Sequence, residues 1–168
     1  MPFFEKDDNA VEGIPLNLII ILLILAIALP IIWAGLSTYD RTQKENDIRN
    51  EIEFIITTIK FVYTNGESNS QRIDVNFDSS FATKVERVEI GGPTRSLWST
   101  IRYKLSGSSK QTIIIENPNI PVANKTDSGL DALEVGEGRH SLLFTATSDY
   151  DFDDDGRNDL YVEVAPVR

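Results

Sequence analysis

The sequence predicts an α+β protein. A long N-terminal helix, first hydrophobic and then amphipathic, is followed by an antiparallel, Ig-like β-sandwich head. Three observations predict this fold. No charged residue occurs between Glu12 and Asp40, and apolar residues then recur at helical spacing up to about residue 64. Six short runs rich in β-branched residues follow, separated by turn-forming residues, as is typical of a β-sandwich.

The apolar stretch runs from Gly13 to Leu36 and reads GIPLNLIIILLILAIALPIIWAGL. A helix needs about 20 consecutive apolar residues to cross the hydrocarbon core of a bilayer. Because the apolar side chains of this stretch point in every direction, it has to be buried in lipid or in other protein. Pro15 suits the first turn of a helix, and Pro30 predicts a kink near residues 26–30.

An alternative for this stretch is a cleaved secretory signal. The sequence Ala26-Ile27-Ala28 matches an A-x-A cleavage site behind an apolar run of suitable length, and cleavage there would leave a chain beginning at Leu29. However, residues 1–12, MPFFEKDDNAVE, are net negative, whereas a secretory n-region is normally positive. The sequence therefore favours an uncleaved helix over a conventional signal peptide.

From Asp40 to Thr64 the sequence becomes amphipathic. Apolar residues recur at spacings of four, three, four and three, which is a coiled-coil-like seam. They are Ile48, Ile52, Ile55, Ile59 and Val62. Asn65-Gly66 predicts the end of the helix. A single helix over residues 14–64 would be roughly 75 Å long, which is longer than a bilayer requires, so protein must bury part of it.

The remaining chain predicts a polar linker over residues 65–70 and a β-sandwich head over residues 71–168. The expected strands are residues 72–77, 84–90, 99–105, 111–116, 141–147 and 160–164. The apolar residues of the second run, KVERVEI, do not alternate cleanly. This indicates either a bulge in the strand or a register error in our assignment of it. Residues 117–139 read either as a functional or mobile loop or as a chain containing a short helix around Gly129 to Leu133.

Composition limits the function. The formal net charge is −10, and residues 65–168 carry 17 acidic and 11 basic side chains, so nucleic acid is not an expected partner. The chain has no cysteine and a single histidine, His140, which excludes thiol chemistry and imidazole metal clusters. No nucleophile-elbow motif accompanies His140. We therefore do not expect an enzyme, and the remaining enzyme hypothesis is a hydrolase that uses the acidic loop described next.

An acidic loop near the C-terminus predicts a calcium site. From Asp151 it reads D-x-D-x-D-G-x-x-D, with carboxylates at Asp151, Asp153, Asp155 and Asp159 and a turn-forming Gly156. Calcium takes six to eight oxygen ligands, and alternate side chains of a curling loop can converge on it. This pattern resembles the calcium loops of FG-GAP-type and thrombospondin-type-3 repeats, which implies a structural Ca²⁺ at these four aspartates. The alternative is a solvated acidic turn, although six aspartates opposed only by Arg157 would repel one another.

Asn124-Lys125-Thr126 is the only N-x-[ST] sequon in the chain. It makes Asn124 a candidate glycosylation site if this face is extracellular.

The order of these parts resembles that of an archaeal type IV pilin or pilin-like protein with a class III signal peptide. The resemblance rests on the short polar leader ending at Gly13, the apolar segment beginning IPLNLIII, Pro30 within the helix and the β-rich head. It implies that prepilin peptidase removes residues 1–13, leaving Ile14 as the first residue. It also implies that subunits leave the membrane and self-associate through residues 14–64 into an extracellular filament for adhesion or motility, driven by an ATPase.

Two other readings remain open. The chain is either a membrane-resident minor pilin or stator, or a single-pass anchored extracellular binding protein whose head recognises a ligand through residues 117–139.

Overall fold

The structure is a computed structural model that describes residues 9–151 and 156–167, with side chains in the first helix described from Leu16. Helix α1 spans Asn9–Thr64. The chain divides into two compact units, Met1–Tyr39 and Asp40–Arg168, so that α1 contributes to both. We describe each unit by itself.

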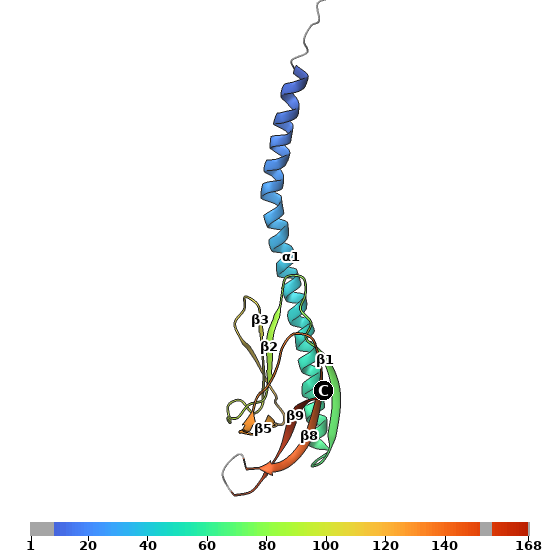
Figure 1. The fold of residues 1–168 in the computed structure, drawn as a ribbon, viewed down its shortest axis with the longest axis vertical. Coiled ribbons are helices and arrows are strands. Elements are labelled where there is room, and N and C mark those ends of the chain that lie inside the picture. Colours follow the sequence, from blue (N-terminus) through green and yellow to red (C-terminus); the bar gives the residue numbers. More distant parts are fainter. Residues whose placement is uncertain (1–8, 152–155, 168) are drawn as a thin grey trace, which may run out of the picture. The chain divides into compact units, whose positions relative to one another are not determined.

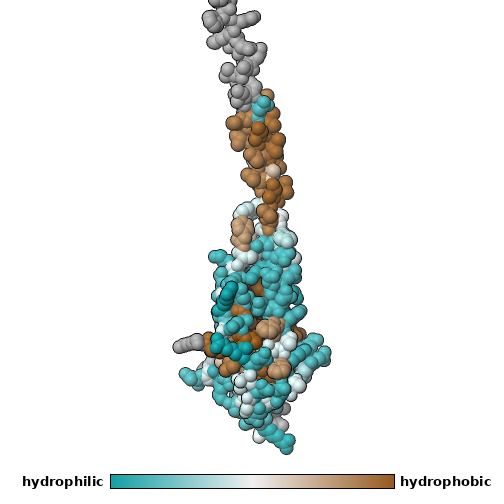
Figure 2. Space-filling view, turned by 90° about the vertical axis from the view of Figure 1, so that its right-hand side faces the viewer, coloured by the Kyte–Doolittle hydropathy of each residue, from teal (hydrophilic) through white to brown (hydrophobic). Residues whose placement is uncertain are grey.

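In the first unit, the large apolar side chains of α1 are exposed all round the helix. Leu16, Ile21, Ile27 and Ile31 are examples, and each exposes more than half of its surface. Figure 2 shows the resulting continuous hydrophobic surface. Among the described residues, α1 is the one helix long and apolar enough to span a membrane. Its helical assignment is unbroken through Pro30.

The second unit contains two β-sheets and the C-terminal part of α1 (Figure 1). The first sheet has the order β1-β8-β9-β5-β6 and the second has the order β4-β3-β2-β7. The strands are β1 (Ser70–Asn76), β2 (Val85–Ile90), β3 (Thr100–Leu105), β4 (Gln111–Ile114), β5 (Val122–Thr126), β6 (Gly129–Asp131), β7 (Leu133–Val135), β8 (Arg139–Tyr150) and β9 (Asp159–Val167). The predicted α+β fold with two packed sheets is therefore confirmed.

Each of the six predicted strands is present, but residues 117–139 differ from both expectations for them. They hold β5, β6 and β7, and Gly129–Asp131 is a strand rather than part of a short helix. β5 also pairs in parallel with β9, whereas the prediction was wholly antiparallel. In β2 the register shifts between Val85 and Arg87, so the strand is irregular in the run where the sequence indicated a bulge or a register error.

The apolar seam of α1 is part of the core of the second unit. Ile48, Ile52, Ile55, Ile59 and Val62 are fully buried and belong to one cluster with the inward-facing residues of both sheets. The compact unit begins at Asp40, so it includes the C-terminal part of α1 together with the two sheets.

Residues 65–69 form a hydrogen-bonded turn between α1 and β1. Gly66, with φ +85°, lies two residues after the last helical residue, Thr64, and its N–H donates to the carbonyl of Tyr63 at 3.1 Å, in agreement with the predicted helix stop. Ser68 N donates to Ala146 O at 2.8 Å, and Ala146 N donates to Asn69 O at 2.9 Å. The helix is thus joined to the first sheet through backbone hydrogen bonds.

Candidate functional site

The acidic loop connects β8 to β9, where Tyr150 pairs with Asp159. Two of the four predicted calcium ligands, Asp153 and Asp155, lie outside the described residues. The other two, Asp151 and Asp159, lie at the two ends of the loop.

The two carboxylate oxygens of Asp151 differ in their hydrogen bonding. Its Oδ2 accepts a hydrogen bond from Gly156 N at 2.8 Å. Gly156 has φ +84°, which supports the predicted turn. The Oδ1 atom of Asp151 is buried and has no hydrogen-bond partner among the described residues. A buried carboxylate oxygen needs a donor or a cation, so this atom is suited to bind one.

Asp149, next to the loop, is neutralised by the protein itself. Lys125 from β5 forms an ion pair with its Oδ2, and the Tyr161 hydroxyl donates to its Oδ1 at 2.7 Å. Hydrogen bonds from Lys125 and Tyr161 hold the pKa of Asp149 below its ordinary value. Burial and this hydrogen bond raise the pKa of Tyr161. In the sequence, Arg157 is the only cation near these aspartates. The structure shows that Lys125, which is distant in the sequence, is a second one.

Within the described residues, no group of three or more His, Asp or Glu side chains is arranged to hold a metal. The calcium site therefore stays a prediction that rests on Asp151, Gly156 and the sequence pattern.

The sequon lies in the β5–β6 hairpin. Asn124 is half-buried and pairs with Asp131, while the Thr126 hydroxyl donates to Gly129 O at 2.8 Å. The predicted cleavage position, Gly13 and Ile14, lies within α1, and the side chains of these residues are outside the described set. Glycosylation and cleavage both stay predictions.

His140 is not arranged as a catalytic base for its neighbour Ser141. Its Nε2 lies 3.0 Å from Gly136 O, and its ring packs near Phe77. Ser141 donates a hydrogen bond to Asp74 instead. Successive residues of a strand point to opposite faces, so the two side chains do not form a nucleophile–base pair.

A buried carboxylate organises the outer face of the second sheet. Glu89 on β2 is only 4% exposed and forms ion pairs with Arg102 at 3.1 Å, Lys110 at 2.6 Å and Arg87 at 3.1 Å. Burial alone would raise the pKa of Glu89, but these three cations lower it below its ordinary value. The network joins β2, β3 and the start of β4, and we assign it a structural role.

Replacing Glu89 with glutamine is expected to lower the free energy of unfolding by about 2 kcal/mol near neutral pH, because three cations lose the buried negative charge that they share. A lowered folded-state pKa stabilises the protein above the ordinary glutamate value, and this stabilisation is lost as pH falls through the folded pKa. The difference between wild type and Glu89→Gln should therefore shrink below a pH of about 4. Denaturant unfolding at several pH values measures it.

The matched control for this prediction is Glu86→Gln. Glu86 forms a 2.6 Å ion pair with Lys104, but both side chains are substantially exposed, at 41% and 38%. Exposed pairs contribute little, so this variant should unfold almost as wild type does. Equal losses in the two variants would contradict the assigned role of Glu89.

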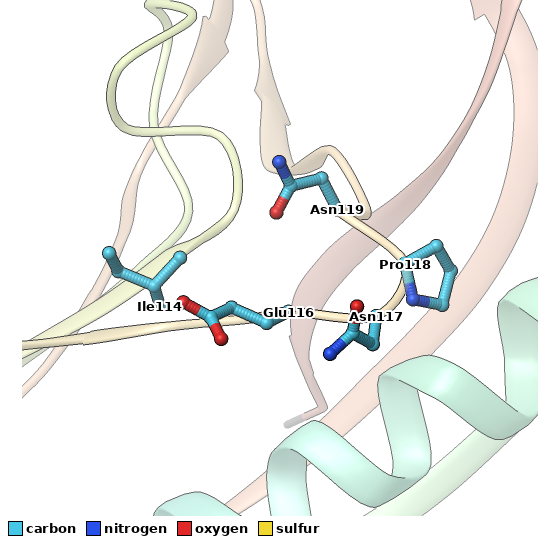
Figure 3. A pocket seen from close by; sticks show the side chains of 5 residues that line it. All are labelled: Ile114, Glu116, Asn117, Pro118 and Asn119. Carbon is cyan, nitrogen blue, oxygen red and sulfur yellow. The ribbon is translucent and has the colours of Figure 1, made fainter.

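Several concave surfaces occur in the second unit, and two of them are candidate ligand sites. One, of about 460 Å³, is lined by Ile114 and by Glu116, Asn117, Pro118 and Asn119 (Figure 3). These residues all come from one short stretch of chain at the end of β4. The other, of about 250 Å³, is lined by residues from four separate segments of the chain. The second is therefore the better-built cavity.

Comparison of the chain with protein-family models, curated proteins and solved structures found no match. The structure itself defines the class: an α+β chain with one long, partly apolar helix and a two-sheet head.

Proposed function

We propose that this chain is a structural, non-enzymatic subunit of a type IV pilus-like extracellular filament, inserted in the cytoplasmic membrane before assembly. One observation carries the proposal. The C-terminal part of α1 is covered by its own two sheets, whereas the apolar part from Leu16 to Leu36 is exposed on every side. A helix of that composition must be buried by lipid or by other protein.

The two parts of α1 match the two requirements of such a subunit. An all-round apolar segment can lie in a bilayer and can later pack against the same segment of other copies. A segment with one apolar stripe can pack against only one surface, and here that surface is the head of the same chain. The α1 helix would thus link a surface-exposed head to a filament core, after prepilin peptidase has cleaved between Gly13 and Ile14.

Replacing Ile21 with glutamate tests the proposal, because a charge in the apolar segment is costly in lipid and in a helix-packed core alike. The variant is expected to abolish filament assembly while the head remains folded. The measurement is electron microscopy of sheared surface filaments, with the variant chain quantified in the membrane fraction and the medium. Intact-mass analysis of the assembled wild-type chain should show a mature protein beginning at Ile14.

Two controls separate assembly from anchoring. Ile21→Leu keeps the apolar surface and should assemble normally. Asn46→Glu adds the same charge to an exposed helical position of the second unit and should also assemble. Absence of filaments from wild-type cells would overturn the filament function, and so would a wild-type chain beginning at Met1 or Leu29. A chain beginning at Met1 would favour the anchored binding protein, and one beginning at Leu29 would favour the secreted binding protein.

We also propose that Ca²⁺ binds the β8–β9 loop and stabilises the second unit. The buried Oδ1 of Asp151 supports this. A ligand that binds only the folded state at a concentration of 100 times its Kd contributes about 2.7 kcal/mol, which corresponds to a rise in Tm of roughly 5 to 10 °C.

The test is thermal melting with calcium and with a chelator. It uses the full-length chain in detergent, because α1 supplies part of the core. Calcium should raise the Tm of the wild type and of Asp127→Asn, a change in the exposed β5–β6 turn, but not that of Asp151→Asn. Identical wild-type curves with calcium and with chelator would rule out a stabilising site.

A further inference from the structure

A cavity of about 250 Å³ lies beside the start of β9 in the second unit. Its walls come from the end of α1, the β2–β3 turn, the β4–β5 connection and β9. The lining side chains that the argument uses are Tyr63, Arg95, Trp98, Asn119 and Asp159.

The walls of this cavity are fixed by hydrogen bonds. Trp98 N donates to Thr94 O at 3.0 Å, and the carbonyl of Trp98 accepts from Val122 N at 3.0 Å. On the adjoining wall, Pro121 O accepts from Val162 N at 2.9 Å. The turn, the connection and both flanking strands are therefore held to one another, so a ligand would not have to order them. Preorganisation of this kind reduces the cost of binding.

The lining has the chemistry that a neutral, hydroxyl-rich ring requires. Trp98 and Tyr63 are partly exposed aromatic residues, and the Nε1 edge of Trp98 is buried, so the accessible part of its ring is apolar carbon. Arg95 offers only donors, Asp159 offers acceptors and Asn119 offers both. An anion would meet the carboxylate of Asp159, and a cation would meet the guanidinium of Arg95. A sugar hydroxyl both donates and accepts, so it can satisfy both groups.

We infer that this cavity binds a pyranose sugar, one face of which stacks on Trp98 while its hydroxyls bond to Arg95, Asn119 and Asp159. The volume suits one sugar ring rather than an oligosaccharide. This binding activity does not depend on filament assembly.

The experiment is saturation-transfer NMR on the full-length chain with glucose, mannose, galactose and N-acetylglucosamine as probes. The detergent is lauryldimethylamine oxide, because glycosidic detergents would compete for the cavity. Choline serves as the probe for a cation site. Each titration is repeated with calcium and with a chelator, because Asp159 is also one of the predicted calcium ligands.

At least one sugar should receive magnetisation from the wild type, and Arg95→Ala should weaken its binding about tenfold through loss of a charged donor. The matched control is Arg139→Ala, which removes another exposed arginine from a different concavity, lined also by Asp74 and His140. It should bind as wild type does, and both variants should keep the wild-type Tm. Transfer to none of the sugars, transfer unaffected by Arg95→Ala, or transfer to choline alone would overturn the inference.

Discussion

Replacing Ile55 with alanine is expected to lower the free energy of unfolding of the second unit by about 3 to 4 kcal/mol. Ile55 lies on α1, is 0% exposed and belongs to the cluster shared with both sheets. Truncating a fully buried isoleucine removes its transfer free energy and leaves a cavity among neighbours that relax only partly. The expected loss is a large fraction of the stability of a domain of this size.

The adjacent residue provides the matched control. Phe54 is 48% exposed on a neighbouring face of the same helix, so Phe54→Ala should change the free energy of unfolding much less, although it removes more atoms. Both variants should be made in a Trp33→Phe background, in which Trp98 is the only tryptophan and its fluorescence reports on the second unit. If Ile55→Ala proved as mild as Phe54→Ala, the helix would not be part of the core.

The sequence predicted what local pattern determines. The apolar stretch, the buried stripe of α1, the helix stop at Gly66 and six of the strands follow from periodicity and turn residues within one segment. The irregularity in β2 also had a local signal, because Val85, Val88 and Ile90 do not alternate.

The missed strands are short, and two of them pair with strands far away in the sequence. β5, β6 and β7 have three to five residues each, too few to show a period; β5 and β6 form a hairpin, β5 also pairs with β9, and β7 pairs with β2. Lys125 of β5 forms an ion pair with Asp149 of β8, a contact that no local motif predicts. The cavity beside β9 is likewise assembled from four segments, so its residues carried no signal as a group.

The surface that covers the buried stripe of α1 also depends on partners far away in the sequence. The spacing of Ile48 to Val62 shows that one face of α1 is buried. Whether other copies of the chain or its own sheets cover that face depends on tertiary packing, and the structure shows that its own sheets do.

Replacing Gly91 with alanine is expected to destabilise the second unit by more than about 4 kcal/mol or to prevent its folding, because two costs add. Gly91 has φ +67°, a conformation that costs an L-residue roughly 1 to 2 kcal/mol. A Cβ at this position would also lie 1.9 Å from the carbonyl oxygen of Val122 and 2.5 Å from its carbonyl carbon. These are backbone atoms, so no side-chain rotation relieves the clash.

The surrounding hydrogen bonds explain why neither strand can retreat. Gly91 N donates to Thr100 O at 2.9 Å, and its carbonyl accepts from Arg102 at 2.8 Å. Val122 is fixed on both sides, because its N–H donates to Trp98 O and its carbonyl accepts from Gly92 N. Gly91 follows β2 of one sheet and Val122 begins β5 of the other, so this close approach joins the two sheets.

Gly107→Ala separates the two costs. Gly107 has φ +69°, almost the same as Gly91, but an added Cβ there meets nothing within 4 Å. This control should therefore lose only the conformational part, about 1 to 2 kcal/mol. The remaining difference between the two variants measures the contact between the sheets. Equal losses in chemical denaturation would show that the sheets can move apart at Gly91 at no cost, which is the outcome that the hydrogen bonds of Gly91 and Val122 argue against.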